Sequence, residues 1–246
     1  MSSKIVKVTN GKILNYTIKA NGYKTINGSQ LITADTTISK NMVTEVDPNG
    51  VYSVGDRLGG IASFVCYFNS TDPDNNTDQK YAVFVLDASY RVLSTKWATS
   101  TNPGDFLPQY TNNALALEAK ESATYNTNLM LNNVSSATIP AFTTASNAST
   151  VTVNGVTYSS QLPNIYELNE INTNKTALDT ADPTVSDYSA NSLATICTSG
   201  IWSSTFRGKL SGTSNRGAFY ISNSAVGSTN VTGTFAIAPV FEIPVE

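Results

Sequence analysis

The chain of 246 residues contains no histidine and only two cysteines, Cys66 and Cys197. Without histidine, a Ser-His-Asp triad, a histidine general base and a histidine-ligated metal site are all excluded. Two cysteines are too few for a small scaffold held together by disulfides. Cys66 lies in the apolar run Phe64–Phe68, which is typical of a buried thiol in a strand, with a disulfide or a reactive thiol as the alternative.

Charged residues are also scarce, at 13% of the chain with a net charge of −3. The 15 lysines and arginines are scattered, so no basic cluster is present to follow a phosphate backbone and nucleic acid is not an expected partner. No apolar run approaches the roughly 20 residues of a membrane span, and residues 1–7 lack the apolar core of a signal peptide. We therefore expect no membrane insertion, and a protein that stays where it is made unless it leaves inside a particle.

Asparagine, serine and threonine are abundant, and together they make up about a third of the chain. These residues favour turns and strands, whereas a helical bundle would need more Glu, Lys, Leu and Ala. Near the C-terminus, aromatic and apolar residues alternate with small polar ones in 201–207, 217–221 and 235–241. This alternation predicts half-buried strands joined by exposed loops. The expected fold class is mainly β.

The first 47 residues predict a small β-sandwich. A strand is expected at 13–20, and Asn21-Gly22 and Asn27-Gly28 are both typical of tight hairpin turns. Further short strands are expected at 31–34 and 36–39. The turn cluster Asp47–Gly50 then marks a domain boundary, so that 1–47 and 48–246 are the two predicted domains.

In the second domain, apolar segments alternate with polar loops. Strands are predicted at 61–68, 81–87 and 92–97, and a hairpin around Asn154-Gly155 within 151–158. Two short helices are predicted, at 113–131 and, after Pro163, at 164–172. The acidic loop 70–78 offers oxygen atoms of the kind that calcium binds, but it lacks the glycine and distal glutamate of a helix–loop–helix site. A solvated hairpin loop is the better interpretation.

The N-terminal block resembles the PEGA-like or carboxypeptidase-regulatory-like β-sandwich modules of phage and bacterial surface proteins. The resemblance is carried by Tyr16-Thr17-Ile18, Asn21-Gly22 and the segment Leu31–Ile38. Such modules act as spacers or attachment points, so the resemblance implies an attachment role for residues 1–47.

The rest of the chain resembles the Lcl C-terminal-like family, whose fold is C-type-lectin-like. Three anchors occur in the family's order: Val54–Ile61, the Leu-Pro…Glu-Leu segment Leu162–Asn169, and the Trp-Ser-Ser segment Ile201–Thr205. The chain departs from the family before Leu162 and in its closing strand, which has no arginine, and the sugar and calcium motifs of true C-type lectins are missing. The resemblance therefore implies a lectin-like α+β domain and a binding role, but not a calcium-dependent sugar site.

Catalysis is not expected. Enzymes related to formylglycine-generating proteins share the lectin-like architecture but need reactive cysteines, and Cys66 in a strand does not fit that role. The 18 acidic residues show no spacing that indicates a paired-carboxylate glycosidase. We expect no cofactor and no metal.

Candidate binding residues lie on two loops, 98–112 and 207–216, which carry the aromatic, arginine and small polar residues that binding loops favour. The candidates are Trp97, Asp105, Tyr110, Arg207 and Arg216. By contrast, Trp202 is expected in the core together with Leu162, Leu168 and Ile171, and Glu167 is expected to be a helix cap or a surface partner.

Together these patterns predict a bacteriophage virion protein, a head or tail fibre such as crAss-like phages carry. The expected partners are further copies of the chain in a dimer or trimer, other virion proteins through residues 1–47, and host surface polysaccharide or protein. Its expected location is the virion, assembled in the host cytoplasm. A bacterial surface adhesin is the alternative, although it would need an export signal, and a decoration protein without a receptor is a third possibility.

Overall fold

The computed structural model of the chain describes residues 11–18, 26–33, 51–73 and 78–246. Strands account for 39% of these residues and helices for 27%, which confirms the expectation of a mainly β fold. None of the helices in these ranges is long and apolar enough to cross a membrane.

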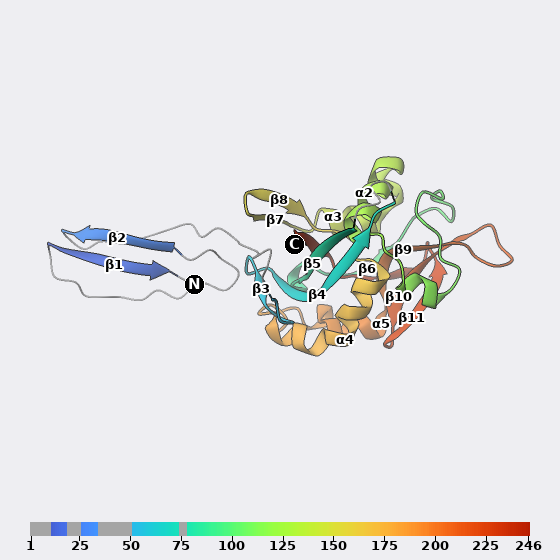
Figure 1. Cartoon of the computed structure of the whole chain (residues 1–246). Coiled ribbons are helices and arrows are strands. Elements are labelled where there is room, and N and C mark those ends of the chain that lie inside the picture. The colour runs from blue at the N-terminus through green and yellow to red at the C-terminus, as the bar shows by residue number, and fades with distance from the viewer. Residues whose placement is uncertain (1–10, 19–25, 34–50, 74–77) are drawn as a thin grey trace.

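The N-terminal part contains one antiparallel hairpin, β1 (Lys12–Ile18) and β2 (Ile26–Ile32), which lies apart from the other elements (Figure 1). Tyr16 pairs with Gly28, and a Cβ atom on Gly28 would lie 2.4 Å from the Tyr16 ring. The second turn predicted at Asn27-Gly28 is therefore wrong, because these residues lie within β2, where glycine leaves room for the ring. The turn at Asn21-Gly22 and the strand at 36–39 lie outside the described residues.

The first larger sheet has four antiparallel strands in the order β13-β5-β4-β3. Their bounds are Arg57–Leu58 for β3, Ala62–Thr71 for β4, Asp78–Leu86 for β5 and Val240–Val245 for β13. Strands β4 and β5 lie at the positions that the sequence predicted, and their residues lie on the two faces of the sheet in turn. One face, with Val65 and Val83, packs into the central core, and the other, with Phe64 and Phe84, packs against the hairpin β7–β8.

That hairpin, β7 (Thr150–Val153) and β8 (Val156–Ser159), turns at Asn154-Gly155 as predicted. Both turn residues have positive φ, 51° and 82°, which is the backbone conformation that an Asn-Gly hairpin turn requires.

The second sheet has five strands in the order β11-β10-β9-β12-β6. The bounds are Val92–Lys96 for β6, Ile201–Lys209 for β9, Arg216–Ser222 for β10, Ala225–Asn230 for β11 and Thr234–Ile237 for β12. The pairing of β12 with β9 is parallel and the others are antiparallel. Residues 201–206 of β9 are all buried, because helices cover both faces of this strand.

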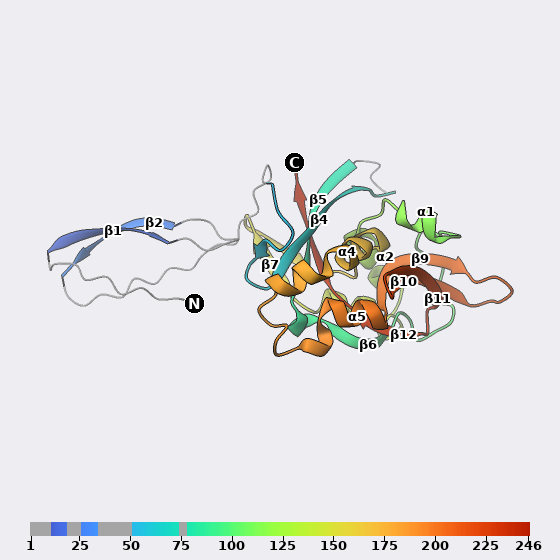
Figure 2. The same ribbon diagram turned by 90° about the horizontal axis from the view of Figure 1, so that it is seen from below.

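Five α-helices occur within the described residues, rather than the two predicted: α1 (Asn113–Leu117), α2 (Ala123–Asn133), α3 (Pro140–Ser146), α4 (Ile165–Ala181) and α5 (Leu193–Ser199). Helices α4 and α5 lie side by side on one face of the five-stranded sheet (Figure 2), and α2 and α3 cover the other face. The helix expected at 164–172 continues to Ala181, with Leu168 and Ile171 in the core as predicted.

The helix predicted across 113–131 is interrupted between α1 and α2. The carbonyl oxygen of Lys120 accepts a hydrogen bond from the Thr71 amide at 3.0 Å, and the Ser122 side chain caps α2 by accepting from Tyr125 N. This backbone pairing with the end of β4 uses a carbonyl that a continuous helix would need for itself.

A buried group of charges connects the four-stranded sheet to the helices. Arg91, 3% exposed, donates from Nη2 to Asp182 at 3.1 Å and from Nη1 to Asp179 at 3.3 Å, and its Nε bonds the Leu86 carbonyl. Asp179 also accepts from the amide of Leu193 at the start of α5. The group therefore holds the end of β5, the end of α4 and the start of α5 together.

Strand β13 is the outer strand of its sheet. Val240 exchanges two backbone hydrogen bonds with Gln161, one in each direction, at 2.8 and 3.0 Å. Further along the strand, Pro244 is exposed.

The two cysteines are both free thiols. Cys66 lies in strand β4, as the sequence indicated, but it is half-buried rather than buried, whereas Cys197 is buried in α5. Burial raises the pKa of both thiols, that of Cys197 to about 12, so the reactive thiolate is disfavoured at neutral pH.

Candidate functional site

The two loops predicted to carry the binding residues lie next to each other. The amide of Arg216 donates to the Thr101 carbonyl at 2.8 Å, and the amide of Tyr110 donates to the Phe206 carbonyl at 3.1 Å. Gln109 also pairs with Phe206 as an isolated bridge. We call the surface formed by residues 98–112 and 207–216 the loop face.

Two of the predicted residues, Asp105 and Arg216, bind each other across the loop face. Arg216 donates from Nε to Oδ1 of Asp105 at 2.5 Å and from Nη2 to Oδ2 at 2.6 Å, and its Nη1 bonds the carbonyl of Ser214. A bidentate arginine–carboxylate pair fixes orientation as well as distance. Asp105 is 40% exposed and Arg216 is 15% exposed, so the pair stands at the surface and fixes one loop against the other.

Tyr110 points inward from the same loop. Its hydroxyl donates to Oε2 of Glu121 at 2.5 Å, and Glu121 is only 8% exposed. Burial, followed by the hydrogen bond to Glu121, raises the pKa of Tyr110. The hydroxyl is therefore neutral and already bonded, and the residue as a whole is half-buried.

Arg207 is directed away from the other loop. It lies on β9, and its Nη1 donates to the hydroxyl of Ser228 on β11. Its side chain thus spans the neighbouring strand β10, and the structure does not bring it together with Asp105 and Arg216.

Trp97 has no exposed surface, and its assignment as a binding residue is wrong. Its Nε1 donates to the Ser203 carbonyl at 2.8 Å. Its ring stacks on Phe206 with centroids 5.5 Å apart and meets Phe142 edge-on at 4.8 Å. The end of β6 places this ring under the loop, in the core, where it supports the loop face but cannot touch a ligand on it.

Phe106, which is 43% exposed in the middle of loop 98–112, is not among the binding residues predicted from the sequence. Gly104, with φ of +106°, lies beneath the ring, and a Cβ atom there would come within 2.2 Å of it. The Asn-Pro-Gly-Asp run before Phe106 is typical of a loop, and an aromatic residue placed directly after it is the signal that could have identified Phe106.

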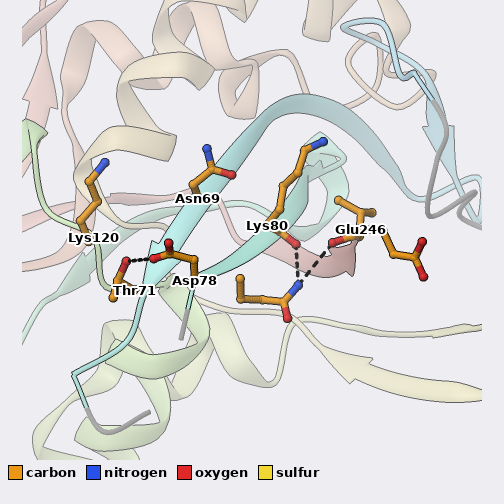
Figure 3. Close-up of a pocket in the computed structure, with 8 residues that line it drawn as sticks. Asn69, Thr71, Asp78, Lys80, Lys120 and Glu246 are labelled. Carbon is orange, nitrogen blue, oxygen red and sulfur yellow. Dashed lines mark hydrogen bonds between the residues drawn. The ribbon is translucent and has the colours of Figure 1, made fainter. Parts of the chain in front are cut away.

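A second, polar hollow lies at the end of the four-stranded sheet, beside the C-terminus (Figure 3). Its volume is about 720 Å³, and it is lined by Asn69, Thr71, Asp78, Gln79, Lys80, Lys120, Val245 and Glu246. Thr71 donates to Asp78 at 2.6 Å, and Gln79 donates to the carbonyls of Lys80 and Val245. Lys80 also rests over the Tyr67 ring at 4.5 Å. Several of these polar groups thus bond one another, and no residue predicted from the sequence for binding lies here.

The acidic loop considered for calcium is described only in part, because 74–77 lie outside the described residues. Asp72 accepts from the amide and the hydroxyl of Ser122, at 3.0 and 3.3 Å, and from the Ser70 hydroxyl at 2.7 Å. This carboxylate is therefore used to hold the start of α2.

The loop face is the surface that best combines exposed aromatic, charged and small polar groups with a fixed backbone. In comparisons with protein-family models, with curated proteins and with solved structures, the chain matches none.

Proposed function

We propose that this chain is a bacteriophage virion protein, a head or tail fibre whose C-terminal domain binds a host cell-surface glycan or protein through the loop face. The main support for a binding role is the bidentate ion pair between Asp105 and Arg216. These residues are 111 positions apart in the sequence, and their pairing joins two loops into one surface.

A surface of this kind suits binding for a thermodynamic reason. Loops that are already fixed lose less conformational entropy when a ligand orders them, so more of the contact energy remains as affinity. The exposed ring of Phe106 offers apolar area, and the neighbouring serine, threonine and asparagine side chains offer adaptable hydrogen bonds. Sugars and protein loops both present this mixture of apolar faces and hydroxyl or amide groups.

The virion context is supported by the two resemblances in the sequence. Residues 1–47 resemble a PEGA-like attachment module, and residues 48–246 resemble an Lcl C-terminal-like domain with a lectin-like fold. In this proposal the N-terminal module attaches to other virion proteins, and copies of the chain form a dimer or trimer, since fibres are closed symmetric assemblies. The protein acts without catalysis or cofactor.

The location is tested by mass spectrometry of purified virions and of host envelope fractions. Peptides of this chain that copurify with infectious particles through a density gradient support the fibre assignment. Peptides found in the envelope of uninfected cells would instead support a bacterial surface adhesin.

The binding role is tested with Phe106→Ala in the full chain and Tyr188→Ala as a matched control. Both aromatic side chains are exposed, by 43% and 47%, but Tyr188 lies before α5, outside the loop face. We expect labelled wild-type protein to bind host cells, Phe106→Ala to bind about tenfold more weakly, as a residue central to an interface does, and Tyr188→Ala to bind normally.

Competition by purified host polysaccharide then separates a glycan from a protein receptor. Equal binding of Phe106→Ala and Tyr188→Ala to host cells would show that the loop face is not the binding site. Absence of any binding by the wild-type chain would favour a decoration protein without a receptor.

A further inference from the structure

Two glutamates from distant parts of the chain meet inside the core. Glu167 lies in the first turn of α4 and Glu242 lies on β13, and their two carboxyl groups interact electrostatically with each other. Glu167 is 0% exposed and Glu242 is 3% exposed. Neither the binding role proposed above nor any resemblance in the sequence uses this pair.

Glu242 has the contacts of an ionised carboxylate. Its Oε1 accepts from the amide of Ala123 at 2.9 Å and its Oε2 from the amide of Thr124 at 2.7 Å. These amides are the first of α2, and the N-terminus of a helix favours a negative charge. Glu242 therefore connects the C-terminal strand to the start of α2.

Glu167 has the contacts of a neutral acid. Its Oε2 accepts from the amide of Asn164 at 2.9 Å, as part of the capping box of α4. Its Oε1 is buried, and no described residue donates a hydrogen bond to it. Two ionised carboxylates have no donor between them, so a hydrogen bond from Glu167 to Glu242 requires a proton on one oxygen. A proton on Oε1 of Glu167 satisfies this atom and makes it the donor.

The surroundings offer no cation in place of that proton. The titratable groups that interact with both glutamates are Cys66 from β4 and Tyr81 from β5; Glu170 from α4 also interacts with Cys66, and Asp72 with Tyr81. None of the lysines and arginines in the described ranges forms an ion pair with either glutamate. A second negative charge here would be buried beside the first, since Glu167 and Glu242 are almost inaccessible to solvent.

We propose that Glu167 and Glu242 share a single proton and act as an alkali-sensitive latch, which holds the C-terminal strand β13 to the first turns of α2 and α4 and weakens when the proton leaves.

The direction of the pH dependence follows from where the proton is held. Burial, and after it the charge of Glu242, raise the pKa of Glu167 well above its ordinary value of 4.5. Above that value the unfolded chain releases the proton while the folded chain retains it. The stabilisation that the shared proton provides is therefore complete below pH 4.5. It is lost as the pH rises toward the pKa of the folded state, because the equilibrium constant for unfolding increases about tenfold per pH unit over this range.

The test compares urea unfolding of the full chain, from about pH 5 to about pH 8, for the wild type, Glu167→Gln and Glu170→Gln. The glutamine amide at 167 can donate permanently to Glu242 and its oxygen can still accept from Asn164. We expect the wild type to lose stability relative to Glu167→Gln as the pH rises. Glu170→Gln, the same change one turn further along α4, should follow the wild-type profile.

Infrared spectroscopy gives a second and direct reading. At neutral pH the wild type and Glu170→Gln should show the carbonyl stretching band of a protonated carboxylic acid, and Glu167→Gln should not. Parallel stability profiles for the wild type and Glu167→Gln, or the absence of this band from the wild type, would overturn the proposal. If Glu167→Gln does not fold, the band in the wild type and its loss at higher pH decide the question alone.

Discussion

Among the aromatic side chains on and beneath the loop face, burial distinguishes the tryptophans that support this surface from Phe106, which a ligand can reach. Trp97 and Trp202 are both fully buried, and the Nε1 of Trp202 donates to the Thr95 carbonyl at 3.0 Å. Each indole therefore fills core volume and also satisfies a backbone carbonyl of another strand in the five-stranded sheet. Phe106, on the loop face, makes no such bond and is available for contact.

Truncation of Trp97 should therefore affect folding. We expect Trp97→Ala to lower the free energy of unfolding by about 3–5 kcal/mol, because it leaves a cavity beside Phe206 and Phe142. Urea unfolding followed by circular dichroism measures this change. Phe106→Ala, as an exposed control, should stay within about 0.5 kcal/mol of the wild type, and an equally small change for Trp97→Ala would contradict the assignment of this residue to the core.

The burial of Trp202 could be predicted from the sequence, but that of Trp97 could not. Trp202 lies within a segment that the sequence predicts as a half-buried strand, and its place in the core was predicted. Trp97 ends a strand and precedes a polar loop, so the sequence is equally consistent with an exposed side chain. Its partners Phe142, Ser203 and Phe206 are remote in the chain, and only the folded arrangement brings them together.

Among the secondary-structure elements, helix α4 begins with a capping box formed by Asn164 and Glu167. Asn164 accepts from the Glu167 amide at 2.9 Å, Glu167 accepts from the Asn164 amide, and the Asn164 amide group also donates to the Glu121 carbonyl at 3.1 Å. All of these atoms are buried, so a lost bond cannot be replaced by water.

Removal of this cap should cost more than removal of an exposed one. We expect Asn164→Ala to destabilise the protein by about 2 kcal/mol, at the upper end for N-cap residues. Asn112→Ala, which removes the exposed cap of the five-residue helix α1, should cost about 0.5 kcal/mol. Equal losses in thermal or urea unfolding would show that burial does not strengthen the cap at α4.

The sequence contains the signal for this helix start, since asparagine followed three positions later by glutamate is a capping-box pattern. The expectation that Glu167 caps a helix or meets a surface partner is confirmed for the cap, but its complete burial was not foreseen. Burial depends on Glu242 and α2, which pack over it from other parts of the chain. The break between α1 and α2 was missed for a similar reason, because it depends on a bond from Thr71 to Lys120.

At the scale of the whole molecule, the two sheets are kept in place by groups that bridge elements. Arg91 is the clearest example, since its bonds reach the end of β5, the end of α4 and the segment before α5. Removing the arginine would leave Asp182, which is 5% exposed, as a buried charge without its partner.

Arg91→Leu should therefore destabilise the protein by about 3–5 kcal/mol, as is usual when one member of a buried ion pair is removed. Arg216→Leu breaks a pair whose carboxylate is 40% exposed, and we expect it to cost about 1 kcal/mol or less. Equilibrium unfolding of both variants measures the difference. A loss for Arg91→Leu as small as that for Arg216→Leu would mean that water reaches the Asp182 carboxylate.

The outer strand β13 has a consequence for association between copies. The backbone N–H and C=O of Val240 both point away from β5 and bond Gln161. The backbone groups of every second residue along a strand point to the same side. Pro244 therefore also faces outward, where it has no N–H to donate. A strand of another chain cannot pair along this edge, because the backbone groups of Val240 are already bonded to Gln161 and Pro244 has no N–H to donate. Two copies therefore cannot pair with each other through their β13 strands to form one continuous sheet.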